Sequence, residues 1–134
     1  MIINEIKNTI SKSALNVSSS VSRFYYNYVP QNTSYPFVVY TLIDETYSKK
    51  DTGILYSDLV VQFSVFSNLN DYGTQANKIL KDIIDYYDFN FIGYANNIIG
   101  TGSVISCIRN FVRPAYFIEG VWQAIVQYTI HVKN

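Results

Sequence analysis

The sequence contains very few of the residues from which most enzyme active sites are built. Among its 134 residues there is one cysteine, Cys107, and one histidine, His131. A single cysteine cannot form an intrachain disulfide, and these two residues are too few for a Cys/His zinc site. A Ser-His-Asp triad would need His131, which continues an alternating pattern and is better explained as a strand residue. We therefore predict that the protein is not an enzyme and that it needs neither a metal nor a cofactor.

Charge is scarce as well. Ten basic and ten acidic residues cancel to a net charge of zero, which favours neither nucleic acid nor an anionic membrane as a partner. The longest apolar run, Phe37 to Ile43, is far shorter than the ~20 residues that span a bilayer. The N-terminus has no basic segment followed by an apolar one, so we predict no secretory signal. These absences predict a protein with no membrane partner and no specific nucleic-acid partner.

Hydrophobic residues, in contrast, are abundant. They make up 49% of the chain, and 13 of the residues are tyrosines. This composition is typical of a folded domain and not of a disordered chain. The length matches one domain, and no repeat or linker divides the sequence. We expect a single domain over residues 1–134.

Two segments have the apolar spacing of amphipathic helices. The first is residues 2–16, which fades at a run of serines. The second is residues 72–86, where Asn70 or Asp71 is the expected N-cap. Its apolar side chains are Ala76, Ile79, Leu80, Ile83 and Tyr87.

The remaining apolar segments predict strands. The clearest are residues 59–66 and 121–132, where apolar and polar side chains alternate and Trp122 heads an apolar face. Residues 23–30 and 37–43 predict two more strands, and Pro36 marks the start of the second. We expect a short strand at 88–93, a loop at 94–102, and a strand at 104–112 that ends at Arg113-Pro114. The predicted fold class is α+β, a mostly antiparallel sheet with two helices packed on one face.

Residues 44–58 predict an extended hairpin arm or a long loop. Charged residues and a glycine form its tip, and apolar residues form its stem. Exposed apolar residues on a long loop are typical of a contact surface. The alternative is a stem that folds back on its own sheet. The candidate interface residues are Tyr47, Lys49, Lys50, Asp51, Ile54, Leu55 and Tyr56.

This order of elements resembles the tail completion, or tail terminator, proteins of long-tailed bacteriophages, whose fold is shared with tail-to-head joining proteins. The resemblance covers nearly the whole chain, but the Lys49-Lys50-Asp51 arm and residues 94–101 depart from the family pattern. It is carried by Tyr28-Val-Pro30, by Tyr35-Pro-Phe-Val-Val-Tyr40, by Val61-Gln-Phe-Ser-Val-Phe66, by the helix with Ala76, Ile79 and Leu80, and by the closing strand Trp122 to Val132.

The resemblance implies a structural role in a virion. Such proteins form a ring, commonly of six subunits, on the last ring of tail tube protein, stop tube growth and dock the head-neck proteins. The implied partners are other copies of the chain, the tail tube protein and the head-tail connector. The implied location is the tail-neck junction, after synthesis in the host cytoplasm.

Two alternatives stay open. The first is another neck component, such as a head-tail adaptor or stopper, which would have a similar size and composition. The second is a single-stranded nucleic-acid-binding module, in which bases would stack on Tyr25, Tyr26, Tyr28 and Tyr40.

Overall fold

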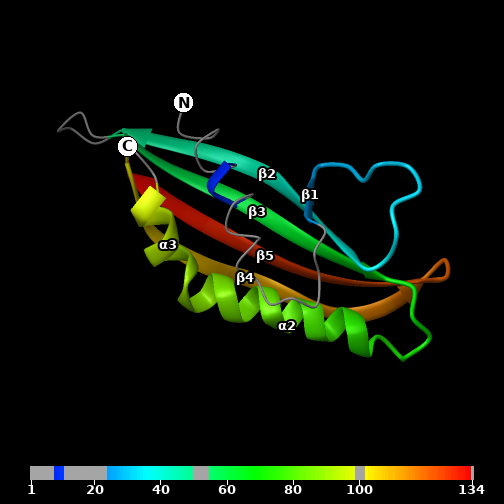
Figure 1. Ribbon diagram of the computed structural model, residues 1–134. Coiled ribbons are helices and arrows are strands. Elements are labelled where there is room, and N and C mark those ends of the chain that lie inside the picture. Colours follow the sequence, from blue (N-terminus) through cyan, green and yellow to red (C-terminus); the bar gives the residue numbers. More distant parts are fainter. Residues whose placement is uncertain (1–7, 11–23, 50–54, 99–101, 134) are drawn as a thin grey trace.

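The computed structural model describes residues 8–10, 24–49, 55–98 and 102–133. Their strands form one five-stranded sheet in the order β1-β2-β3-β5-β4, in which only the β1–β2 pair is parallel. Helices α2 and α3 lie along one side of the sheet (Figure 1), which confirms the α+β class. The elements are β1 (Phe24–Tyr26), β2 (Phe37–Lys49), β3 (Leu55–Ser67), α2 (Thr74–Phe89), α3 (Phe91–Ile98), β4 (Ser103–Ile118) and β5 (Val121–Lys133).

The predicted N-terminal helix falls largely outside the described residues. Residues 8–10 are helical, and Ile10 is fully buried in the core. Among the described helices, none is long and apolar enough to cross a membrane.

Strands β2 and β3 form one long antiparallel hairpin. Its pairing runs from Phe37 opposite Phe66 to Lys49 opposite Leu55, with one irregularity between Leu42 and Asp44. The predicted arm is therefore the far end of a regular hairpin, and the tip at residues 50–54 lies outside the described residues. Pro36 stands directly before β2, as predicted, where its missing N–H costs no ladder hydrogen bond.

The core lies between the sheet and the helices. Alternate side chains of β3 and β5 point toward α2 and are fully buried, as the sequence pattern predicts. The predicted apolar stripe of α2 is buried against them. Trp122 is only half-buried at the margin of this core. The central core residues are Leu59, Val61, Phe63, Val65, Ala76, Ile79, Leu80, Ile83, Tyr87, Ala124, Val126, Tyr128 and Ile130.

Helix α2 begins two residues later than predicted. Its N-cap is Gly73, with φ of 83°, and the Asp71 carboxylate accepts hydrogen bonds from the backbone N–H groups of Gly73 (3.1 Å) and Gln75 (2.9 Å). Asp71 therefore satisfies free N–H groups at the helix start from just outside it. A Cβ on Gly73 would lie 2.8 Å from Ala115 Cβ, so β4 can approach this closely only because residue 73 is glycine.

Two predictions about the segment after α2 are wrong. Residues 91–98 form helix α3 instead of a strand and a loop, because Phe91 and Ala95, four residues apart, are both buried in the core. Strand β4 also continues through Arg113-Pro114 to Ile118. It can do so because β4 is an edge strand and the pairing shifts register between Arg113 and Tyr116, where Pro114 has no ladder partner to lose.

Candidate functional site: an aromatic groove on the open sheet face

The sheet face opposite the helices has two regions of different character. In the middle, polar side chains bond to one another: the Asn110 amide donates to Gln127 Oε1 (3.1 Å) and Thr129 Oγ1 (2.8 Å). Gln127 in turn donates to Gln62 Oε1 (3.4 Å). At the end where β2 begins and β3 ends, aromatic and aliphatic side chains replace these polar groups.

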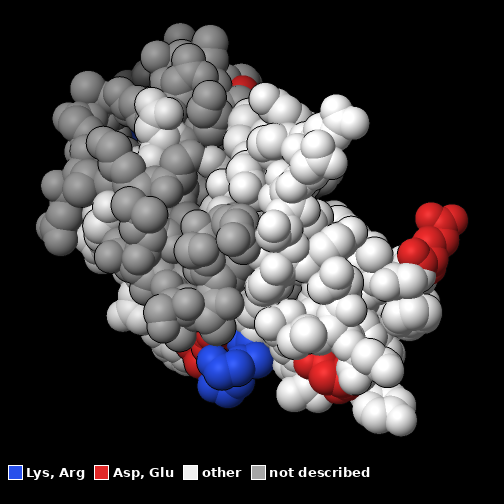
Figure 2. All heavy atoms as spheres, turned by 45° about the vertical axis from the view of Figure 1, so that its right-hand side comes forward, with Lys and Arg blue, Asp and Glu red and all other residues white. Residues whose placement is uncertain are grey.

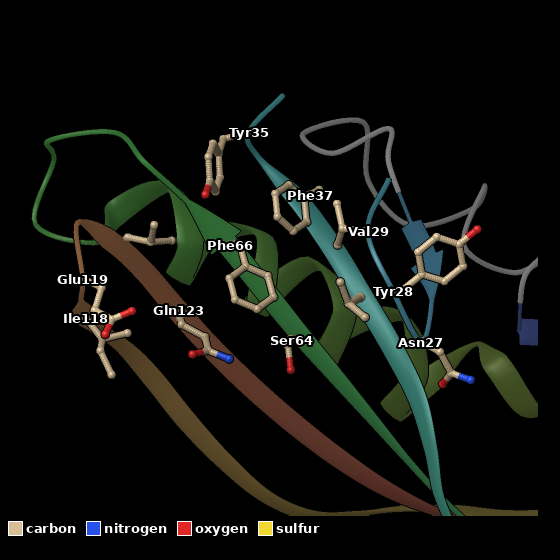
Figure 3. Close-up of a pocket in the computed structure, with 12 residues that line it drawn as sticks. Asn27, Tyr28, Val29, Tyr35, Phe37, Ser64, Phe66, Ile118, Glu119 and Gln123 are labelled. Carbon is tan, nitrogen blue, oxygen red and sulfur yellow. The ribbon is translucent and has the colours of Figure 1, made fainter. Parts of the chain in front are cut away.

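That apolar end contains a cavity of about 600 Å³, which we call the aromatic groove (Figure 3). Its floor comes from β2, β3 and β5, and its walls come from the segment after β1 and the turn between β4 and β5. The lining residues are Asn27, Tyr28, Val29, Tyr35, Phe37, Val39, Ser64, Phe66, Ile118, Glu119, Val121 and Gln123.

Cross-strand pairing builds the floor of the groove. Phe37 and Phe66 are directly opposite in the β2–β3 ladder, and their rings stack with centroids 5.1 Å apart. The Tyr35 ring lies 5.0 Å from that of Phe37. Tyr28, on the far wall, is 73% exposed. The result is a preformed surface of aromatic side chains, of the kind that protein interfaces favour.

A two-residue turn holds the other wall. Glu119 and Gly120 both have positive φ, 50° and 82°, as a type I′ hairpin turn between β4 and β5 requires. The turn places Ile118 and Val121, which are paired, at the groove margin. Glu119 is the only charged lining residue, and most of the described residues visible in Figure 2 are uncharged.

The lining is mostly apolar and aromatic. The lining has no histidine, cysteine or lysine, and its only carboxylate stands alone at the turn. The described part of the chain also contains no group of three or more His, Cys, Asp and Glu side chains that could hold a metal ion. The groove can therefore take an apolar or aromatic protein segment, but it offers no general acid–base pair.

The described members of the predicted interface set lie at the opposite end of the β2–β3 hairpin from the groove. Backbone pairing places Tyr47 opposite Ser57 and Lys49 opposite Leu55, whereas Lys50, Asp51 and Ile54 fall outside the described residues. Tyr56 stacks on the His131 ring with centroids 5.5 Å apart. Tyr56 therefore packs on its own sheet, as the alternative interpretation of the arm expects for a stem residue.

The four tyrosines considered for base stacking do not form an exposed platform. Tyr40 is 2% exposed and packs against Phe63 and Tyr26, while Tyr25 and Tyr26 are half-buried. Only Tyr28 is freely accessible among them, and it belongs to the aromatic groove.

One ionisable cluster lies on the covered side of the sheet. The Tyr128 hydroxyl donates to Asp88 Oδ1 (2.7 Å), and Arg109 Nη2 lies 3.6 Å from Asp88 Oδ2. Burial, with a smaller contribution from the Asp88 charge, raises the pKa of the Cys107 thiol from 9.0 to about 12. Burial also raises the pKa of Tyr128, and its hydrogen bond to Asp88 acts in the same direction. These groups stay protonated at neutral pH, so Cys107 is a structural and not a reactive thiol.

The sequence analysis did not identify the groove. Its residues come from five separate segments, and no spacing pattern connects them. Tyr28 and Tyr35, on either side of the loop that contains Pro30, were the available local signal, because loops lie on the protein surface.

Comparisons with known proteins show what the fold is similar to. No family model and no curated protein matches the sequence. Among solved structures, a chain of the virion of a native gene transfer agent particle matches with a TM-score of 0.66 and 14% sequence identity. The match covers 99% of this chain and 92% of that chain. The two chains therefore share one fold over nearly their whole lengths.

Proposed function

We propose that the protein is a structural component of a phage-like virion that caps the tail tube as a ring. In this role it terminates tube growth and forms the joint to the head-neck proteins. The observation that carries the proposal is the shared fold with a chain of a gene transfer agent virion, which extends over almost all of both chains. The position at the tail-neck junction and a ring of six subunits follow from the resemblance to tail terminator proteins.

The chemistry of the open sheet face supports an assembly role. A groove lined by aromatic side chains and a single carboxylate can bury apolar surface of another protein without desolvating many charges. A net charge of zero also avoids long-range repulsion between identical subunits packed around an axis.

The far end of the β2–β3 hairpin is the proposed contact with a neighbouring subunit or with the tube. It includes the described residues of the predicted interface, at the end of the molecule away from the groove. A subunit with contact features at both ends suits a position between two partners.

The direct test mixes purified protein with growing tail tubes and measures tube length by negative-stain electron microscopy. We expect a cap at one tube end and tubes of uniform length. Tubes of unchanged length with no bound protein would overturn the proposal.

A shortened arm tests the hairpin separately. Replacing residues 48–55 with a Gly-Ser link retains Tyr56 on His131 and should leave the core intact, because closure entropy changes slowly with loop length. The control replaces Asn68 and Asn70, in the exposed loop before α2, with serine. We expect overlong tubes with the shortened arm and normal tubes with the control. Normal capping by the shortened protein would exclude the arm as the contact.

A neck adaptor or stopper remains the second candidate, since the same shared fold and the same mostly apolar groove would serve it. In that role the protein should bind the isolated head connector and leave tube length unchanged. The same mixing experiment, repeated with connectors, distinguishes the two roles.

A further inference from the structure

Exposed apolar side chains concentrate on one strand. Of the twelve large hydrophobic side chains that are exposed in the described part of the chain, six belong to β4. Strand β4 is at an edge of the sheet, so one side of its backbone has no strand neighbour among the described residues. The six residues are Ile105, Ile108, Phe111, Val112, Phe117 and Ile118.

These side chains wrap around the edge from both sheet faces. Ile108 is paired with Thr129, which lies on the open face, whereas Phe117 is paired with Trp122, which points to the covered face. With about 200 Å² of surface per large side chain, six half-exposed side chains present on the order of 600 Å². A standard interface buries roughly 800 Å² per partner, so this strand provides most of one interface.

The edge is not suited to open-ended strand addition. Its pairing with β5 shifts register at three places, between Val104 and Ser106, Arg109 and Phe111, and Arg113 and Tyr116. Such irregularities, together with Pro114, keep another strand from pairing along the whole edge. A partner must therefore contact β4 through side chains.

We propose that the β4 edge is a subunit interface that contacts a second copy of this chain head-to-tail. Strand β4 carries Arg109 and Arg113 and no Asp or Glu. A two-fold contact of β4 with itself would therefore offer Arg113 no opposite charge, whereas a head-to-tail contact can use a different surface that carries one.

That surface is the β2 side of the sheet, around Ile43 and Asp44. Ile43 is 51% exposed, and Asp44 is an exposed carboxylate whose Oδ1 accepts a hydrogen bond from the Glu45 N–H (2.8 Å). Asp44 is paired with Val60 and Arg113 with Ile125, so both side chains lie on the open face, and their opposite charges are complementary across an edge-to-edge contact. A contact between two different edges can close into a ring. The inference thus rests on the proposed ring and names its subunit interface.

The first experiment measures the assembly state of the full chain by sedimentation velocity and light scattering. The double variant Ile108→Asp/Phe117→Asp places charges in the apolar row, at side chains 61% and 60% exposed. The matched control is Tyr72→Asp, at a side chain 89% exposed but outside β4. Circular dichroism and thermal unfolding check that each variant is folded.

We expect the wild type and the control to form closed rings and the double variant to be monomeric. The apparent dissociation constant should rise about 100-fold or more, as expected when two central apolar contacts are lost. A double variant that still forms rings overturns the proposal. So does a wild type that stays monomeric, or one that stops at a symmetric dimer.

Charge reversal tests the pairing of the two edges. Arg113→Glu should weaken ring formation, and adding Asp44→Arg to the same chain should restore it. A folded double charge variant that stays dissociated overturns the assignment of Asp44 as the partner charge.

The failure of the tail-capping role is distinguishable from the failure of the β4 interface. If rings form through β4 but tubes grow past them, the inference stands and the proposed function fails; if β4 variants cap tubes as the wild type does, the reverse holds.

Discussion

The two faces of this sheet differ in what they bury, although the same strands build both. On β3, Phe63 points toward the helices, is fully buried, and has ring neighbours in Tyr40, Tyr87 and Tyr128. Phe66, three residues later, points to the open face, is half-buried, and stacks on Phe37. The covered face therefore holds the buried core, whereas the open face and the β4 edge leave apolar side chains exposed.

The hydrogen bonds of polar side chains also differ between the two faces. On the covered face, the Tyr128 hydroxyl bonds to a carboxylate in a partly buried cluster. On the open face, the neighbouring residue Gln127 belongs to a neutral, exposed network of amides and a hydroxyl. Hydrogen bonds to charged groups contribute more than neutral, solvated ones, so the two networks should differ in their effect on stability.

The largest expected effect compares two phenylalanines on one strand. Phe63→Ala should lower the free energy of unfolding by about 3–5 kcal/mol, because it leaves a cavity in a closed core. Phe66→Ala should cost about 1–2 kcal/mol, because water can fill the space on the open face. Urea unfolding of both variants measures the difference. Equal losses would mean that the open face is as much a part of the core as the covered one.

Gly73→Ala tests the close approach of the start of α2 to β4 on the covered side of the sheet. The new Cβ would lie 2.8 Å from Ala115 Cβ and 3.0 Å from Trp122, at a backbone with φ of 83°. We expect a loss of about 2–3 kcal/mol from strain and displacement together. Gly120→Ala is the matched control, since φ is 82° there but no atom lies within 4 Å, and its cost should be about 1 kcal/mol. If thermal unfolding shows the same loss for both, the contact with β4 contributes nothing.

Substitutions at two adjacent residues of β5 compare the contributions of the two polar networks to stability. Tyr128→Phe removes the hydrogen bond to Asp88 while retaining the ring, and should cost about 1.5–2 kcal/mol. Gln127→Ala, on the open face, should cost less than about 1 kcal/mol, because its partners can bond to water. Chemical denaturation at pH 7 provides the measurement. A larger loss for the glutamine would reverse the division between the faces.

The smallest effect is a pH dependence in the alkaline range. The Cys107 thiol has a pKa of about 12 in the folded protein against 9.0 ordinarily, so the unfolded chain ionises first as pH rises. Stability is therefore unaffected by this group below pH 9 and falls between pH 9 and pH 12. We expect the wild type to lose about 1 kcal/mol more than Cys107→Ala between pH 9 and pH 10. If the two proteins lose the same stability between pH 9 and pH 10, the thiol is exposed to solvent and not buried.

The elements that the sequence predicts best are those whose pattern is local and unbroken. The alternation in residues 59–66 and 121–132 correctly assigned each side chain to a face, and the stripe from Ala76 to Tyr87 predicted α2. Helix α3 was missed because Phe89, Phe91 and Ile92 stand close together around a single Asn, a composition that equally suits a strand. Its helical state depends on burial of Phe91 and on Asn96, whose side chain bonds both backbone groups of Val104.

By itself, the sequence determined the α+β class, the faces of the long strands and the principal helix. These follow from residue type and from periods of two and 3.6, which are properties of neighbouring residues. The tertiary structure alone decided which sheet face stays open, where the aromatic groove forms, and that β4 is an edge strand with its apolar side chains exposed. Those properties depend on which distant segments pack together. The spacing of apolar residues along the chain does not indicate such long-range packing.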